Sequence, residues 1–350
     1  MTDLRSAVEA QADACAELGS PMYASLLRRI GTGLGATPAI DRVLAGHETD
    51  PGPSALALRL LGTVHRLVLE RRAGDLALYY PSVGGRWDLD AAWPALLAVL
   101  DEHADVVRAG LGRPPQTNEV GRSAALVGAL LRLGASTFPV RLVELGASAG
   151  LNLRADRYRY SGAGGSWGPT GSPVHLDGAW RGVPTPVDRV LQIVERLGCD
   201  PAPIDPTTTA GRVLLTAYVW PDQHARLERL RGALEVAATA PAEVRAERAE
   251  QLVAGLRLVQ GTCTVVWHSV MWQYLDTAEQ VAVRGELDRL AAEAEADTPF
   301  VHLALEPGRR KPAAAHEFLV TVERWPPEPG APGRIVGASV GHGVPVTWER

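Results

Sequence analysis

Lysine is almost absent from this sequence of 350 residues, because Lys311 is the only one and arginine supplies the remaining positive charge. The net charge of −5 gives no basic footprint of the kind that nucleic-acid-binding proteins carry. The three cysteines, Cys15, Cys199 and Cys263, are widely spaced and form no C-x-x-C pair. We therefore expect free thiols, a reducing cytoplasmic location and no disulfide framework.

Several other features that carry chemistry are missing. The N-terminus has no apolar signal core, and runs such as Ala91–Leu100 are too short to span a bilayer, so we expect no membrane association. The histidines are scattered without H-x-x-x-H or H-E-x-x-H spacing, which makes a metal site unexpected. No G-x-x-x-x-G-K-[ST] loop is present, which disfavours nucleoside triphosphate hydrolysis.

Residues 1–138 have helical periodicity and no convincing alternating strand. Apolar spacing and capping residues predict helices over 4–18, 21–30, 55–72 (capped by Ser54), 91–108 and 119–133. We expect an all-helical N-terminal region that covers the substrate.

From residue 139 onward the pattern alternates between strand and helix. Strands are expected at 141–145, 174–177, 243–246, 262–268 and 300–306, and helices at 187–197, 225–234 and 277–294. The runs 317–325 and 334–341 predict an antiparallel pair. We therefore expect 139–350 to be an α/β domain with a mostly parallel sheet and a C-terminal antiparallel hairpin. Ligands of such sheets bind outside the carboxyl ends of the strands, near the switch point.

A turn of small residues, 144–150 (E-L-G-A-S-A-G), follows the first of these strands. Small side chains let backbone N–H groups approach a ligand closely. The turn matches the hydrolase elbow G-x-S-x-G with Ser148 as nucleophile. It matches a dinucleotide fingerprint poorly, because the third glycine would fall at Leu151. An ordinary strand-to-helix turn that needs small residues is the plain structural alternative.

The turn also resembles the acidic-x-G-x-G-x-G motif of class I S-adenosylmethionine-dependent methyltransferases, with Ser148 replacing the middle glycine. The order of elements over 139–345 is similar to that family as well. The resemblance implies a Rossmann-like, methyltransferase-type fold with S-adenosylmethionine as cofactor. It implies a ribose carboxylate at Asp177 and an adenine-side acid at Glu247. The implied contacts within the turn are Glu144, Gly146, Ala147, Ser148 and Gly150.

Substrate contacts are expected from two other places. His268, Ser269 and Trp272 come at or after the end of the strand expected at 262–268, where the resemblance puts the substrate. An imidazole there suits proton transfer, so His268 is the first candidate base and Glu119 the second. Asn118 and Arg122 would contact the substrate from a lid, although Asn118 is equally suited to capping a helix.

Residues 219–223 (V-W-P-D-Q) interrupt two helical stretches. Either Asp222 serves as a plain N-cap at this break, or Trp220 and Gln223 form a pocket wall. Together with Q-T-N-E-V at 116–120 and E-L-G-A-S-A-G-L-N-L at 144–153, this run resembles the hallmarks of an actinobacterial family of unknown function. That resemblance implies a methyltransferase-like core behind a helical region and no settled reaction.

Four hypotheses remain open. The first is an S-adenosylmethionine-binding, methyltransferase-like enzyme for a small molecule. The second keeps the fold for elimination or ring closure of a small metabolite without methylation. The third is a Ser148 hydrolase, which needs a downstream histidine such as His302, His316 or His342. The fourth is a non-catalytic binding or scaffold subunit, and a protein partner or a homo-oligomer stays open in every case.

Overall fold

The computed structural model describes residues 3–50, 55–112, 115–134, 138–327 and 335–349. The chain forms two compact units, and it passes between them more than once. The first unit comprises Met1–Thr117 and Thr208–Leu227, and the second comprises Asn118–Thr207 and Glu228–Arg350. The expected boundary between 138 and 139 divides the chain differently, since 208–227 returns to the first unit. That the boundary between 138 and 139 separates two independently folding domains stays a prediction.

Helices make up the first unit. Ser20 accepts a hydrogen bond from the amide of Tyr23 and Pro21 occupies the first turn, so α2 begins where capping chemistry favours it. Residues 91–108 were expected as one helix, but His103 breaks them into α5 and α6. Neither glycine nor proline marks that break. Ser54, the expected cap, lies outside the described residues. The helices are α1 (Leu4–Glu17), α2 (Pro21–Gly33), α3 (Pro38–Leu44), α4 (Leu56–Leu69), η2 (Gly74–Tyr79), η3 (Pro81–Val83), α5 (Leu89–Glu102), α6 (Ala104–Leu111) and α8 (Thr209–Ala217).

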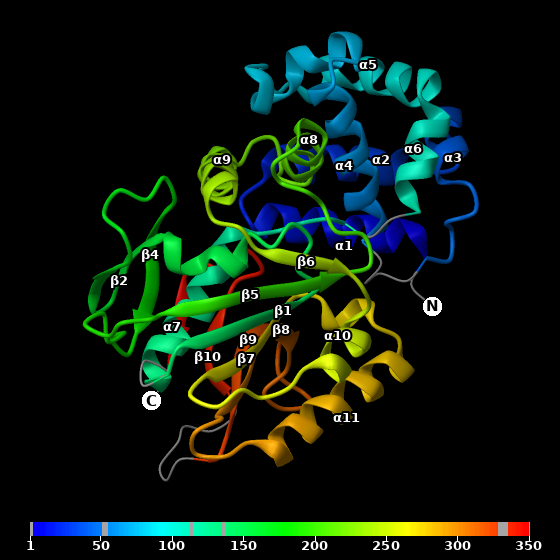
Figure 1. The fold of residues 1–350 in the computed structure, drawn as a ribbon. Helices are drawn as coiled ribbons and strands as arrows, with labels where there is room; N and C mark the ends of the chain where they lie inside the picture. The colour runs from blue at the N-terminus through cyan, green and yellow to red at the C-terminus, as the bar shows by residue number, and fades with distance from the viewer. Residues whose placement is uncertain (1–2, 51–54, 113–114, 135–137, 328–334, 350) are drawn as a thin grey trace. The chain divides into compact units, whose positions relative to one another are not determined.

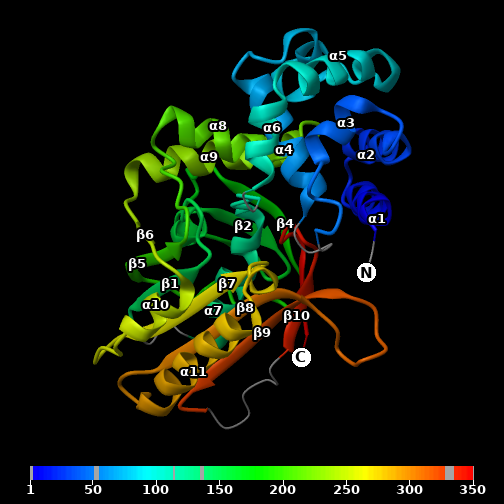
Figure 2. The same ribbon diagram turned by 90° about the vertical axis from the view of Figure 1, so that its right-hand side faces the viewer.

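The second unit is built on one sheet with the order β3-β2-β4-β11-β10-β9-β8-β7-β1-β5-β6 (Figure 1). Strands β6, β5, β1, β7 and β8 are mutually parallel, whereas β9 and β10 are antiparallel to their neighbours (Figure 2). The strands are β1 (Val140–Leu145), β2 (Arg159–Gly162), β3 (Gly165–Trp167), β4 (His175–Gly182), β5 (Ile193–Asp200), β6 (Glu243–Ala246), β7 (Cys263–Ser269), β8 (Phe300–Gly308), β9 (Glu317–Trp325), β10 (Ile335–Ser339) and β11 (Val346–Trp348).

The helical elements of the second unit surround this sheet. They are η4 (Val120–Arg122), α7 (Ser123–Leu133), η6 (Asn152–Arg157), α10 (Ala249–Gly255), η7 (Trp272–Tyr274) and α11 (Thr277–Glu293), and α9 (His224–Thr239) begins in the first unit and continues into the second. Among the described residues, no helix combines the length and apolar character needed to cross a membrane.

The prediction of a helix over 187–197 was wrong, because this stretch leads into strand β5. Its apolar spacing suits a helix, but β5 is paired with β1 on one side and with β6 on the other. Pairing on both edges overrides local propensity. Gly198 permits the close packing, since a Cβ added there would lie 2.7 Å from the Cβ of Ala147. The predicted antiparallel pair near the C-terminus is confirmed as β9 and β10.

The sheet has two faces that carry different side chains. Val143, Leu145 and Val266 pack with the apolar sides of α10 and α11 in one core, and these two helices lie side by side in Figure 1. Side chains alternate along a strand, so Glu144 and its paired residue Trp267 project from the opposite face. His268, paired with Leu145, projects on the α11 face. At the carboxyl ends of β1 and β7, Glu144 and Trp267 therefore lie on one face of the sheet, and His268 lies on the other face.

Candidate functional site

The carboxyl ends of β1 and β7 meet at the middle of the parallel strands. After β1 the chain first forms β2, β3 and β4, then adds β5 on one side of β1 and later β7 on the other side. Open α/β sheets bind ligands where the strand order reverses in this way. Ser148 follows β1 with φ +52° and Val270 follows β7 with φ +49°. Left-handed backbone is uncommon for non-glycine residues and an outlier for β-branched valine, and such strain gathers at functional sites.

Glu144 is the central buried group of this edge, with only 2 % of its surface exposed. The side-chain amide of Asn152 donates to its Oε1 at 3.4 Å, and its Oε2 has no partner among the described residues. Burial raises the pKa of Glu144 to about 8, against the opposing effects of neighbouring donors and cations. The carboxyl group is therefore mainly protonated near neutral pH.

Three further buried polar atoms near Glu144 also lack hydrogen-bond partners among the described residues. They are the hydroxyl of Ser148, Oδ1 of Asn152 and the indole nitrogen of Trp267. The indole lies close enough to lower the pKa of Glu144, although it makes no hydrogen bond of normal geometry. Buried polar atoms are nearly always paired, so a group of unpaired ones needs an explanation, such as a ligand or water. Among the described residues, no base lies within hydrogen-bonding distance of the Ser148 hydroxyl, the contact that a serine nucleophile uses.

The backbone of the turn is held from two sides. The amide of Ser148 donates to Oδ2 of Asp200 at 3.0 Å, and the amide of Leu151 donates to Oδ1 of Asn118 at 2.8 Å. Gly146 has φ +66°, and a Cβ added to it would lie 2.9 Å from the Cβ of Met271. The residue after Val270 therefore packs directly over the first glycine of the turn.

A chain of buried polar side chains crosses the other face of the sheet. Nδ1 of His268 lies 2.8 Å from Oε1 of Glu306, and its Nε2 lies 3.0 Å from Nε2 of His302. Nδ1 of His302 lies 2.9 Å from Glu323, whose carboxylate accepts two bonds from Arg284 at 2.9 and 3.0 Å. This relay, Glu306–His268–His302–Glu323–Arg284, joins β7, β8, β9 and α11.

The donor and acceptor atoms of the relay can be assigned by starting from its Glu323–Arg284 end. The Arg284-bound carboxylate of Glu323 accepts, so Nδ1 of His302 carries a proton. Burial lowers the pKa of His302 to about 4, so its Nε2 is bare near neutral pH and accepts from His268. Both ring nitrogens of His268 are thus engaged. The ring also stacks on Trp272, with centroids 5.2 Å apart.

Glu306 is the residue of this site that sequence reasoning missed. Its Oε1 accepts from the amides of Met271 and Trp272 at 3.0 and 3.3 Å, whereas its buried Oε2 has no partner among the described residues. The available signal was its place as the last residue of the strand expected at 300–306, at the ligand-facing end.

Residues 118–122 join the same edge of the second unit. Arg122 donates to the carbonyl of Ser269 at 3.2 Å and to that of Gly341 at 3.1 Å. Buried Glu119 accepts from the amide of Gly121 at 3.0 Å and lies 3.9 Å from Arg229. The carboxylate of Glu119 is thus committed to local contacts, and Asn118 and Arg122 are the members of this segment that reach the ends of β1 and β7.

The other expected residues are placed elsewhere. Asp177 lies on β4, separated from β1 by β11, β10, β9, β8 and β7, and its side chain is 81 % exposed. It does not join the turn, because the strand beside β1 is β5, which ends in Asp200. Glu247 follows β6 as expected and is half-buried. Trp220 and Gln223 belong to the first unit, where Gln223 donates to the carbonyl of Leu18 at 2.7 Å.

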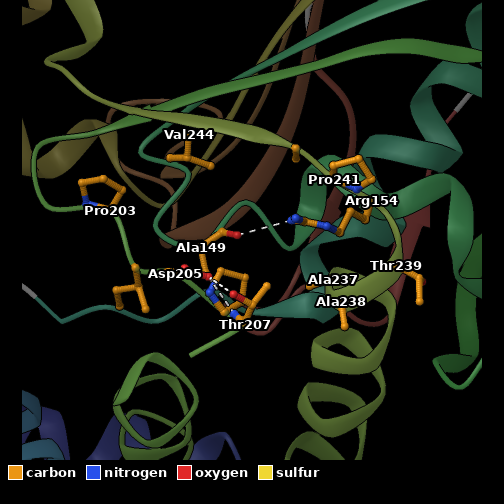
Figure 3. Close-up of a pocket in the computed structure, with 13 residues that line it drawn as sticks. Ala149, Arg154, Pro203, Asp205, Thr207, Ala237, Ala238, Thr239, Pro241 and Val244 are labelled. Atoms are coloured by element: carbon orange, nitrogen blue, oxygen red, sulfur yellow. Dashed lines mark hydrogen bonds between the residues drawn. The ribbon is translucent and has the colours of Figure 1, made fainter. Parts of the chain in front are cut away.

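A cavity of about 530 Å³ opens beside the turn within the second unit (Figure 3). Its walls are Ala149 of the turn, residues 203–207 after β5, residues 237–239 at the end of α9, and Val244 of β6. Val244 is paired with Gly198, which is paired in turn with Glu144. The cavity therefore lies on the same face of the sheet as Glu144.

In the described part of the chain, no group of three or more His, Cys, Asp or Glu residues could hold a metal ion.

Residues 5–348 match the family described as "Uncharacterized protein conserved in bacteria (DUF2332)". Because this match covers nearly the whole chain, the chain belongs to that family. No curated protein and no solved structure matches it.

Proposed function

We propose that this member of an uncharacterised bacterial family is an S-adenosylmethionine-binding, methyltransferase-like enzyme that acts on a small molecule. The observation that carries the proposal is the group of unpaired polar atoms on Glu144, Ser148, Asn152 and Trp267. Each such buried atom costs about 1–3 kcal/mol when it is left unsatisfied, and a polar ligand would remove that cost.

The strand order supports this proposal. Numbered along the chain among themselves, β6, β5, β1, β7 and β8 follow the order 3-2-1-4-5 of a doubly wound, Rossmann-like sheet. The small-residue turn then follows the central first strand. The C-terminal part, in which β8, β9 and β10 are neighbours in chain order, is a simple meander beside that core.

The residues present fit the cofactor in part. Glu144 and Ser148 offer a carboxyl and a hydroxyl with free hydrogen-bonding capacity, which suits the amino, carboxylate and hydroxyl groups of S-adenosylmethionine. Asp200, at the end of β5, already accepts from the amides of Ser148 and Ala202. Met271 covers Gly146, so residues 270–272 must shift before a ligand can reach that glycine.

When bound, the cofactor would supply an activated methyl group, and the chain would supply orientation and proton removal. We assign proton removal to Glu306 and not to His268, because both nitrogens of that imidazole are engaged. The bond between the proton and the substrate heteroatom breaks, the proton goes to Oε2 of Glu306, and the electron pair stays on the substrate. His268 and His302 are positioning residues that hold this carboxylate.

A second candidate function is proton transfer without methylation, in elimination or ring closure. The contact between Met271 and Gly146 favours it, because the turn is already covered at the point where a methyltransferase cofactor would approach. The relay behind Glu306 would serve this chemistry equally well.

Calorimetry with S-adenosylmethionine and S-adenosylhomocysteine separates the two candidates. We expect both ligands to bind to the wild type. In the double variant Glu144→Ala/Ser148→Ala the affinity should be lowered at least about tenfold, since a buried hydrogen bond to a polar ligand is lost at each position. Asp177→Ala is the matched control on the distant strand β4 and should leave affinity unchanged. No heat with either ligand at millimolar concentration would contradict the proposal and leave the second candidate.

A further inference from the structure

The cavity beside the turn has walls with about as much polar as apolar surface, and one buried cation lines it. Figure 3 shows the guanidinium of Arg154 reaching toward the carbonyl of Ala149. Proline, alanine, isoleucine and valine side chains make up most of the remaining wall, and Asp205 lies at an exposed position. A cavity of about 530 Å³ is within the range that small-molecule sites occupy. Its walls, polar and apolar in about equal parts, suit a ligand that has both an apolar body and a polar head group.

Arg154 is buried, and no carboxylate in the described part of the chain forms an ion pair with it. Its Nε donates to the carbonyl of Ala240 at 2.6 Å, and its Nη1 donates to those of Gly150 and Ala149 at 2.7 and 3.4 Å. Within the described residues its Nη2 makes no hydrogen bond. Buried charges in proteins are ordinarily paired, so this guanidinium has an unmet need for an anion.

The carboxylates near Arg154 in the described ranges do not meet that need. Glu144 acts electrostatically on Arg154, but burial raises the pKa of Glu144 to about 8, so it is mainly uncharged near neutral pH. Arg196, which also acts on Arg154, is itself paired with Asp156 at 2.8 Å. Asp205 is exposed to solvent and is bound by the amide and hydroxyl of Thr207.

We propose that this cavity binds a small organic anion, whose apolar body lies against the proline and alanine walls and whose carboxylate or phosphate pairs with Arg154. The guanidinium presents a planar set of donors suited to such a group. The site does not depend on the proposed methyltransferase-like function, since it is defined by the cavity and by Arg154. It could accompany either candidate reaction.

Phenylacetate, phenyl phosphate and the neutral analogue phenylacetamide test this inference by calorimetry on the full chain. We expect at least one of the two anions to bind, and phenylacetamide to bind at least about tenfold more weakly, because it lacks the charge-assisted contact. The two anions differ only in their head group, so their affinities show which one Arg154 prefers. Binding of inorganic phosphate as tight as that of the aryl anions would overturn the proposal of an organic ligand.

Two tryptophan substitutions localise the binding. Ala238→Trp, on an exposed wall position, fills the cavity and should abolish binding of the anions, whereas Ala254→Trp, at an exposed position of α10, should leave it intact. Arg154→Gln should also abolish binding, but Arg154 holds three carbonyls, so the cavity-filling variant carries the decision if Arg154→Gln fails to fold. The proposal is wrong if neither anion binds at millimolar concentration, if Ala238→Trp binds like the wild type, or if phenylacetamide binds as tightly as phenylacetate.

Discussion

Two short polar segments, 144–150 in the second unit and 220–223 in the first, behave in opposite ways. Asp222 accepts from the hydroxyl of Ser20 at 2.7 Å and from the amide of Met22 at 3.0 Å. Gln223 donates to Leu18 and accepts from Arg226 at 2.6 Å. The polar side chains of residues 222 and 223 therefore form hydrogen bonds that stabilise the first unit. In contrast, Glu144 and Ser148 keep buried oxygens without partners among the described residues.

The difference separates a capping motif from a candidate ligand site. Both segments are polar interruptions of regular structure, and their sequences alone do not show which polar atoms are used. Asp222 satisfies the free amides of a helix end, which is a complete structural explanation. The unpaired atoms at Glu144 and Ser148 have no such explanation within their own unit, and they stand at the switch point of the sheet.

The largest expected effect that separates the segments is the pH dependence of stability at Glu144. Its folded pKa of about 8 exceeds the model-peptide value of 4.5, so the folded protein keeps a proton that the unfolded chain loses. Stability should therefore fall as pH rises from 4.5 to about 8, by up to about 1.4 kcal/mol per pH unit, and level off above that. Glu144→Gln should remove this slope in urea unfolding, and parallel curves for the two proteins would contradict the assignment.

A second pH effect is expected in both units. It is a loss of stability as the pH falls, which is opposite in sign to the effect of Glu144. Burial lowers the pKa of His65, in the first unit, and of His302, in the second, from 6.5 to about 4. Both are neutral when folded, so their stabilising contribution is present above pH 6.5 and is lost as pH falls toward 4, by up to about 1.4 kcal/mol per pH unit each. His65→Gln and His302→Gln should each reduce the acid slope measured by chemical denaturation. A slope unchanged in either variant would show that the histidine concerned takes up its proton in both states.

Loss of the Asp222 contacts should destabilise the protein without touching ligand binding. Asp222→Ala removes a helix cap and a hydroxyl partner together, which should lower the free energy of unfolding by about 2 kcal/mol. S-adenosylhomocysteine affinity should stay at the wild-type value. Exposed Glu17 on α1 provides the comparison within the same unit, since Glu17→Ala should change stability by no more than about 0.5 kcal/mol. A loss of affinity in folded Asp222→Ala would contradict the separation of the two segments.

Ser148→Ala should have the opposite outcome to Asp222→Ala, because it should lower ligand affinity without lowering stability. Its effect should be the smallest of the series. The buried hydroxyl has no partner among the described residues, so its removal should not lower the free energy of unfolding of the ligand-free protein and should raise it by about 1 kcal/mol. Affinity for S-adenosylhomocysteine should fall by about threefold to tenfold, as expected for one net hydrogen bond. A large loss of stability with unchanged affinity would assign the hydroxyl a structural role.

The sequence was most informative where structure is local. The stretches 243–246 and 317–325 were expected as strands and are β6 and β9, because their alternation and flanking turn residues are read within a few positions. Residues 187–197 failed as a helix because pairing with β1 and β6 decides their state. No local pattern carries that information.

The same distinction between local and long-range information applies to the site residues. The turn, His268 and Glu306 all stand at the ends of expected strands, so their positions could be read from the sequence, whereas Asp200 could not be assigned to this site before the strand order was known. The bond between His268 and His302 joins residues 34 positions apart. Asp177 was chosen because β4 comes next among the expected strands, but β5 is the strand that lies beside β1.

Hydrogen exchange of the full chain with and without saturating S-adenosylhomocysteine tests the central claim most directly, because it measures both segments in one sample. The account predicts added protection at 144–152 and at 268–272, with no change at 220–226. Equal exchange at 144–152 in the two samples, or protection confined to 220–226, would contradict it.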